Sequence, residues 1–178
     1  MRTAVKLMSS KIAAQGTDTV KPLTTSVGNV HLKNPVMLAS GTAGHGTELS
    51  SVTDLSGVGA LVVKSLSAYE WEGNSAPRLH ETPNGMINSI GLQGPGLSYW
   101  MEDILPQLID KEITVVLSIW GRTIEDYAAA ADLCSDLPSA VKAVELNISC
   151  PNVEDRGKMF SHTPVSYTHL RAHETRSD

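Results

Sequence analysis

The segment AVELNISCPN, residues 143–152, begins as an apolar run and ends in a polar cluster around one cysteine. Asn147, Ser149 and Asn152 place two amides and a hydroxyl around Cys150. A thiol in a polar cleft that excludes water can act as a general base or nucleophile. A buried structural thiol is the commoner role, but it predicts apolar neighbours. A zinc site is disfavoured because no cysteine stands at C-x-x-C spacing.

Three other stretches contain residue types that bind ligands. Lys64 closes the apolar run ALVVK, and it is either a solvated gatekeeper or a charge aimed at an anionic ligand. The glycine-rich stretch 39–46 has neither P-loop nor dinucleotide-fingerprint spacing, so it is equally well a flexible loop beside a flat ligand. The stretch 84–96 is either a plain surface loop or a set of amide donors for a planar polar ligand.

Four apolar runs of strand length must position these groups. Their continuous hydrophobicity predicts strands buried on both faces, as in a parallel sheet. The runs are 36–39, 60–64, 114–119 and 143–148. A β-hairpin is expected ahead of them, around Gly28 and Asn29, because both residues tolerate positive φ.

Helical patterns separate the later runs. One apolar stripe spans 97–108, with Pro106 expected to kink or shorten the helix. Its members are Leu97, Trp100, Met101, Ile104, Leu105 and Leu108. A second helix begins after Thr123 as N-cap, with Asp126 three residues on. The buried face of this second helix is predicted to hold Tyr127, Ala130, Ala131 and Cys134.

Alternating strands and helices predict an α/β fold, either a barrel or an open doubly wound sheet. Ser40, Lys64, Ser118 and Asn147 all fall at or near the carboxyl ends of the four runs. Such residues converge on the mouth of a (β/α)₈ TIM barrel, where active sites of that fold lie, which favours the barrel. Four strands make only half a barrel, and the fold typically needs about 250 residues, so the chain is expected to be incomplete.

Composition narrows the class of partner. The 178 residues carry a formal net charge of -5 without a dense basic block, which argues against nucleic acid and anionic membranes. No run approaches the roughly 18 apolar residues of a spanning helix, and no signal peptide is evident. We therefore expect a cytoplasmic protein in which the two cysteines are free thiols.

Five segments together closely resemble the class 1 dihydroorotate dehydrogenases: NPVMLASGTAG, ALVVKSLS, GNSAPRLHET, GMINSIGLQGPG and VELNISCPN. The resemblance covers about residues 23–160 in unbroken order, so we assign 22–160 to the N-terminal half of such an enzyme. It implies an FMN-containing (β/α)₈ barrel that oxidises dihydroorotate to orotate in pyrimidine biosynthesis. The related dihydropyrimidine dehydrogenases, which share the barrel and a similar cysteine segment, are the alternative.

The resemblance also implies roles for single residues. Cys150 would remove the C5 proton of dihydroorotate while the C6 hydride passes to the flavin. The residues implied to hold the flavin are Ser40, Lys64, Ser65, Ser118 and Asn147. The residues implied to bind the substrate are Lys64, Asn88, Ser89, Ile90, Gly91, Leu92, Asn147 and Asn152.

A cysteine at position 150, in place of the serine of the membrane-bound class 2 enzymes, indicates the soluble class 1. The segments IGLQ and CPNVEDRGKMF look more like subclass 1B, which passes electrons to NAD through an iron-sulfur flavoprotein subunit. The resemblance therefore implies that partner subunit, and a homodimer or heterotetramer when the enzyme is intact.

Both ends of the chain depart from this pattern. Residues 1–21 show no sustained period and are expected to be a flexible lead-in. Residues 161–178 are polar, and we expect a disordered tail or a foreign junction sequence. His169 and His173 could share a helix face with His162 nearby, but no clear carboxylate or cysteine completes a metal site. The competing hypothesis is a truncated fragment without catalytic function, because half a barrel exposes sheet edges and core.

Overall fold

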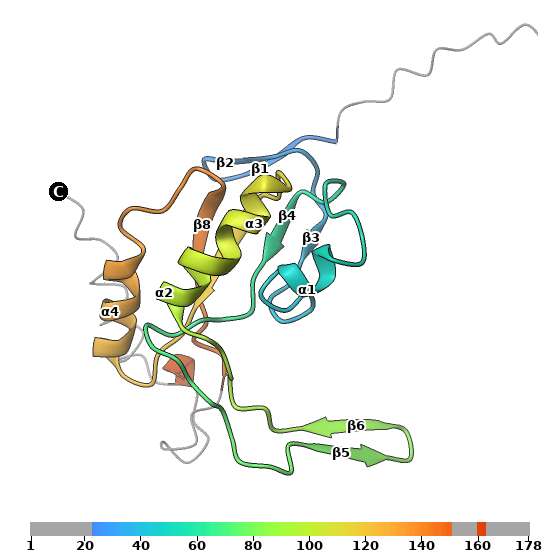
Figure 1. Cartoon of the computed structure of the whole chain (residues 1–178), viewed down its shortest axis with the longest axis vertical. Coiled ribbons are helices and arrows are strands. Elements are labelled where there is room, and N and C mark those ends of the chain that lie inside the picture. The colour runs from blue at the N-terminus through green and yellow to red at the C-terminus, as the bar shows by residue number, and fades with distance from the viewer. Residues whose placement is uncertain (1–22, 151–159, 163–178) are drawn as a thin grey trace, which may run out of the picture.

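A computed structural model describes residues 23–150 and 160–162 of the chain. Its centre is a four-stranded sheet in which every neighbouring pair is parallel (Figure 1). The strands, in spatial order, are β3 (Met37–Leu38), β4 (Ala60–Val62), β7 (Val115–Ile119) and β8 (Val141–Leu146). All four predicted strands are confirmed, with ends that shift by up to two residues.

Helical segments connect these strands, which confirms the α/β class. They are α1 (Thr47–Ser50), α2 (Leu97–Tyr99), a π-helical turn (Trp100–Ile104), α3 (Leu105–Asp110) and α4 (Ile124–Leu133). The spatial order of the sheet follows the order of the strands in the chain. None of the helices in this described part is both long and apolar enough to cross a membrane.

The predicted stripe over 97–108 is confirmed, since four of its six side chains are buried and the other two are half-buried against the same core. The helical run nevertheless continues to Asp110, so Pro106 does not shorten it, and the alternative, a kink, stays a prediction. Pro106 lies in the first turn of α3, directly after the π-helical turn. A missing N–H is tolerated at the start of a helix, because that group has no intrahelical acceptor there.

The start of α4 is confirmed in detail. The Thr123 side chain accepts a hydrogen bond from the Asp126 backbone N–H, and Asp126 reaches back to the Thr123 N–H, forming a capping box. Tyr127 and Ala130 are buried as predicted. Ala131 is exposed, which corrects its predicted place on the buried face, and α4 therefore buries a narrower stripe than the sequence suggested.

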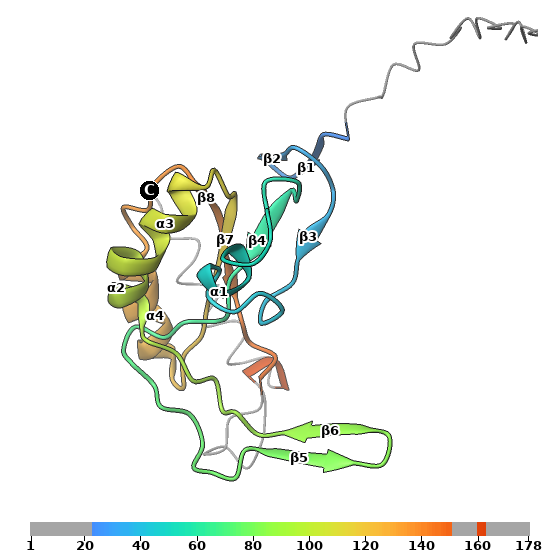
Figure 2. The ribbon, with the colours of Figure 1, turned by 45° about the vertical axis from the view of Figure 1, so that its right-hand side comes forward.

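The two faces of the sheet have different neighbours. Helices α2, α3 and α4 lie on one side, where they cover an apolar core (Figure 2). Sheet residues in this core are Leu61, Val63, Val115, Leu117 and Ile119. On the other face Ala60, Val62 and Val116 pack against Leu32. Leu32 belongs to the predicted N-terminal hairpin, which is confirmed as β1 (Thr25–Val27) and β2 (Val30–Leu32), with Gly28 at φ 56°.

A second hairpin was not predicted. Strands β5 (Leu79–Thr82) and β6 (Gly85–Asn88) pair antiparallel and extend away from the parallel sheet (Figure 1). The stretch from residue 84 was interpreted as a loop. The two turn residues are Pro83 and Asn84, and both residue types are typical of turns, which was the missed signal.

Candidate functional site

Polar side chains from all four parallel strands meet at the carboxyl edge of the sheet. Ser65 and Ser118 are almost wholly buried, and their Oγ atoms lie 2.9 Å apart. Asn147 Nδ2 donates to Ser65 Oγ at 2.9 Å. Ser40 Oγ lies 3.5 Å from Ser65 Oγ and donates to the carbonyl oxygen of Val63 at 3.0 Å. The structure thus brings together four of the five residues implied to hold a flavin.

Parallel pairing explains why residues far apart in the chain converge here. Ser118 follows Val116 by two positions, so it lies on the face of β7 that is opposite to the helices. The register of β7 and β8 sets Ser118 directly beside Glu145, whose carboxylate accepts the Ser118 hydroxyl at 2.7 Å. The sequence analysis missed Glu145. The available signal was that Glu145 precedes Asn147 by two residues and therefore shares its face.

Hydrogen bonds fix both the backbone and the side chain of Asn147. Its backbone N–H donates to Ile119 at 2.8 Å, and its carbonyl accepts the Tyr127 hydroxyl at 2.6 Å. Burial raises the pKa of Tyr127 to about 12, so this phenol remains a donor throughout the neutral range. The side-chain Nδ2 also donates to the Sγ of half-buried Cys150 at 3.3 Å, while Oδ1 accepts from the Ser149 backbone and hydroxyl. The thiol therefore faces an amide donor, as its polar sequence neighbours predicted.

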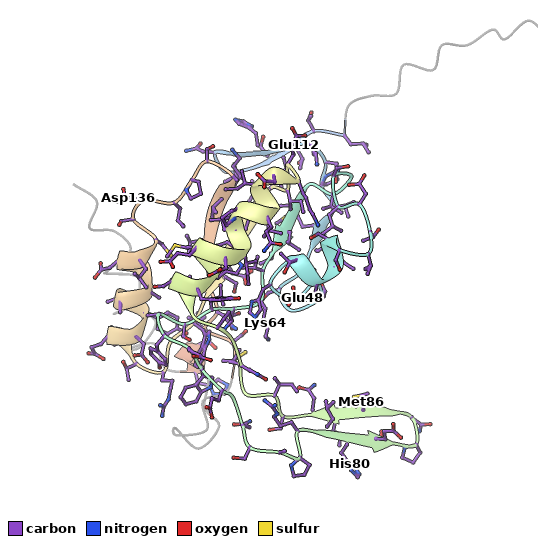
Figure 3. All side chains as sticks on the ribbon, in the orientation of Figure 1. Glu48, Lys64, His80, Met86, Glu112 and Asp136 are labelled. Carbon is purple, nitrogen blue, oxygen red and sulfur yellow. The ribbon has the colours of Figure 1, made fainter. Side chains whose placement is uncertain are left out.

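Lys64 ends the second strand run as a half-buried side chain at the same end of the molecule as the β5–β6 hairpin (Figure 3). Its backbone N–H donates to Gly44 at 2.8 Å. Within the described residues no hydrogen bond occupies its ammonium group. Gly41, at φ 82°, lies beside it, and a Cβ there would come 3.6 Å from Nζ. A Cβ at that distance would make only an ordinary contact, so neither of the two roles weighed for Lys64 is tested and the ligand role stays a prediction.

His45 lies in the same glycine-rich loop. Burial lowers its pKa, with a smaller contribution in the same direction from Lys64, while Glu48 opposes the shift. Its Nδ1 is buried without a hydrogen-bond partner in the described part of the chain. Because the lowered pKa favours the neutral ring near pH 7, Lys64 supplies the positive charge of this corner.

Residues 88–92 lie apart from the strand-end residues. Ser89 donates from its backbone to Arg78 at 2.8 Å, and Asn74 Nδ2 reaches the Ser89 hydroxyl at 2.9 Å. The Gly91 carbonyl accepts from the Trp71 indole at 2.8 Å. Leu92 has φ 59°, a left-handed conformation that is uncommon for leucine and is found preferentially at functional sites.

The base of the hairpin is nevertheless tied to the sheet. Trp71 makes an edge-to-face contact with Trp120, which follows β7, at 6.0 Å between ring centroids. The guanidinium of Arg122 lies over the Trp71 ring at 4.9 Å. An open groove of about 780 Å³ lies next to this contact and is lined in part by His45, Trp71 and Ile90. Residues 88–92 are therefore connected to the end of β7 through Trp71, which donates a hydrogen bond to Gly91 and packs on Trp120.

Several predictions concern residues that lie outside the described part of the chain. They include the substrate residue Asn152, the candidate metal ligands His169 and His173, the lead-in 1–21 and most of the tail 161–178. His162 is exposed in a short 3₁₀ turn, Phe160–His162. Among the described residues, no three His, Cys, Asp or Glu side chains are grouped as metal ligands.

Fold and site together define an α/β protein with a cluster of polar side chains, the candidate site, at the carboxyl edge of a parallel sheet. A family model described as dihydroorotate dehydrogenase matches residues 22–177. The chain belongs to the dihydroorotate dehydrogenase family. This match reaches into the segment 161–178, whereas alignments with curated relatives cover 132 to 142 residues. The expectation of a foreign tail stays a prediction.

Curated relatives show the same family at considerable identity. The chain is 42% identical over 138 residues to "Dihydroorotate dehydrogenase B (NAD(+)), catalytic subunit" of Bacteroides thetaiotaomicron, covering 78% of this chain and 45% of that protein. The protein of the same name from Thermoanaerobacter pseudethanolicus is 46% identical, with 80% and 46% covered. An Aquifex aeolicus protein provisionally named dihydroorotate dehydrogenase A (fumarate) is 45% identical, with 76% and 44% covered. The chain thus spans about half the length of these relatives.

Proposed function

We propose that this chain is the N-terminal half of an FMN-dependent dihydroorotate dehydrogenase, which oxidises dihydroorotate to orotate in pyrimidine biosynthesis. The observation that carries the proposal is the contact of Asn147 Nδ2 with Cys150 Sγ at the carboxyl edge of the sheet. This contact joins the thiol to the polar residues that end the other strands. Cys150, the proposed base, then lies at the carboxyl ends of the strands, where the active sites of barrel enzymes are found.

The complete fold in this proposal is a (β/α)₈ barrel. The four described strands are parallel and follow one another in chain order without a reversal. An open doubly wound sheet reverses its strand order at the ligand crevice, whereas a barrel does not. The share of about 45% of the relatives' length agrees with four of eight strands in this segment. The 178 residues alone are then expected to lack turnover.

The residues at the sheet edge suit a flavin and an anionic substrate. Ser40, Ser65, Ser118 and Asn147 offer hydroxyls and an amide, and Lys64 offers an uncovered cation beside Gly41. The same ammonium would bind the substrate carboxylate, together with Asn147, Asn152 and the segment 88–92. A bound FMN would supply the acceptor for the hydride that leaves C6. Cys150 Sγ, as the thiolate, would take the proton that leaves C5.

The finer assignment concerns the electron acceptor. We place the chain in subclass 1B, a cytoplasmic enzyme whose partner is an iron-sulfur flavoprotein subunit that delivers electrons to NAD, in a homodimer or heterotetramer. The names of the Bacteroides and Thermoanaerobacter relatives support this subclass. The Aquifex relative, named for fumarate, is similarly identical, so the acceptor must be tested directly. Fumarate-dependent turnover without a partner subunit would contradict subclass 1B.

The test of the proposal is a complete barrel, built by joining residues 22–160 to the C-terminal half of the Bacteroides relative. We expect bound FMN, seen as a flavin absorption spectrum, and formation of orotate. Cys150→Ala should keep the flavin and lose orotate formation, whereas Cys134→Ala should keep both because Cys134 lies at the end of α4. Full activity of Cys150→Ala would overturn the assignment of the base.

A second measurement concerns the 178-residue chain itself. We expect neither retained FMN nor orotate formation, because the other half of the barrel must complete the site. A purified 178-residue chain that is yellow and turns over dihydroorotate would contradict the half-barrel proposal. A joined barrel that folds without binding FMN would contradict the cofactor assignment.

A further inference from the structure

Glu145 has no role in the proposed reaction, yet its carboxylate contacts the candidate site. It accepts a 2.7 Å hydrogen bond from Ser118, its direct neighbour across the β7–β8 pair. Ser118 is fully buried, whereas Glu145 itself is exposed on the described part of the chain. We propose that Glu145 is a positioning residue that orients the side-chain amide of Asn147 toward Cys150. The hydrogen-bond arrangement stands on its own contacts, and only its effect on proton removal by Cys150 rests on the proposed function.

The direction of each hydrogen bond follows from the carboxylate. An ionised carboxylate can only accept, so the single hydroxyl proton of Ser118 points to Glu145. The 2.9 Å contact between Ser118 and Ser65 must then use the Ser65 proton. With its own proton spent, Ser65 Oγ is an acceptor, and it receives Asn147 Nδ2 at 2.9 Å. The chain therefore runs in one direction, from Asn147 to Glu145.

A neighbouring contact does not disturb this direction. Ser40 lies 3.5 Å from Ser65, but its hydroxyl proton goes to the Val63 carbonyl at 3.0 Å. The long contact with Ser40 therefore does not compete with Ser118 for the hydroxyl proton of Ser65. Each hydroxyl in the set has one proton and one acceptor, which is the condition for a fully satisfied network.

The amide of Asn147 has two N–H groups, and both are used. One points to Ser65 and the other to Cys150 Sγ at 3.3 Å. The Oδ1 on the other side accepts from the Ser149 backbone at 3.3 Å and from its hydroxyl at 3.0 Å. An acceptor at Ser65 thus holds the amide in the orientation that presents an N–H to the thiol.

Removing the carboxylate should loosen this arrangement. Without Glu145 the Ser118 proton can turn toward Ser65, and the Ser65 proton then faces Asn147 Nδ2, donor against donor. The amide would lose its fixed orientation and with it the N–H directed at Cys150. Since a donor on sulfur stabilises the thiolate, the nucleophilic form of Cys150 would become rarer.

The test is the rate at which iodoacetamide alkylates Cys150 in the 178-residue chain near neutral pH, in a Cys134→Ala background that leaves one thiol. We expect Glu145→Ala to lower this rate about three- to fivefold, the loss typical of one hydrogen bond. Glu145→Gln keeps an oxygen that can accept from Ser118, so most of the rate should return. Glu112→Ala removes the same charge at the opposite end of the sheet and should change nothing (Figure 3).

The sign of the effect separates the proposal from a simple charge effect. Deleting a nearby negative charge would by itself favour the thiolate and raise the rate. Ser118→Ala interrupts the same chain one step earlier, so it should slow alkylation to the same extent, and Glu145→Ala should add nothing in that background. An unchanged or raised rate in Glu145→Ala, with native circular dichroism, would overturn the proposal. The proposal would also be overturned if Glu145→Ala lowered the alkylation rate by the full factor again in the Ser118→Ala background.

This readout needs neither FMN nor dihydroorotate. A slower alkylation together with an inactive joined barrel would sustain the hydrogen-bond chain and contradict the proposed reaction alone. An active joined barrel in which Glu145→Ala alkylates normally would contradict the positioning role alone.

Discussion

The two faces of the central sheet differ along the direction of the strands. The helix-covered face is apolar from end to end and is sealed by α2, α3 and α4. The opposite face begins apolar, at Val62 and Val116, and turns polar toward the carboxyl ends. The residues of its polar part are Ser118, Glu145 and Asn147. The larger apolar core and the candidate site thus lie on opposite faces of the same strands.

Leu117 and Ser118 make this contrast testable, since they are consecutive, fully buried and directed to opposite faces. Leu117→Ala should lower the free energy of unfolding by about 2–5 kcal/mol, because it leaves a cavity under the helices. Urea denaturation followed by circular dichroism measures the loss. A loss below about 1 kcal/mol would mean that the helix-covered face collapses around the cavity.

The cap of α4 should contribute less. Thr123→Ala removes the acceptor for the Asp126 N–H, and we expect a loss of about 1 kcal/mol. Thr53→Ala, at an exposed position outside any helix or strand, is the matched control and should leave the denaturation midpoint unchanged. Equal losses in the two variants would show that the capping box does not hold α4 against the sheet.

Ser118→Ala should cost less than Leu117→Ala. It removes hydrogen bonds to Ser65 and Glu145; the exposed Glu145 carboxylate keeps its hydration, but the buried Ser65 hydroxyl loses its acceptor, so we expect a loss of about 1–2 kcal/mol. The same denaturation experiment applies. A loss as large as that of Leu117→Ala would erase the distinction between the two faces.

The pH dependence of stability offers a further comparison, between the two thiols. Burial raises the pKa of Cys134 from 9.0 to about 11, so the folded chain keeps this thiol neutral where the unfolded chain ionises it. Stability from Cys134 is therefore present below pH 9 and falls as the pH rises from 9 toward 11. Cys134→Ala should flatten the fall in the denaturation midpoint over this window. Cys150→Ala, at a half-buried site, is the comparison variant.

Local sequence signals predicted the described elements wherever one pattern dominated. The four strands and the stripe on the helix at 97–108 came from hydrophobic periodicity, and the capping box of α4 came from Thr123 and Asp126. Ala131 was misplaced because periodicity cannot tell how wide a stripe the neighbouring sheet will cover. The β5–β6 hairpin was missed because its strands are exposed and lack a core-facing pattern, despite the turn residues Pro83 and Asn84.

The candidate site, like the fold, was predictable from the sequence only in part. The sequence by itself determined that Cys150 has polar neighbours and that Ser40, Lys64, Ser118 and Asn147 fall near strand ends. Only the tertiary structure decided that Ser118 faces Glu145, because parallel strands acquire their register from packing and not from local sequence. That register sets the direction of every hydrogen bond from Glu145 to Asn147, and through them the group that Cys150 meets.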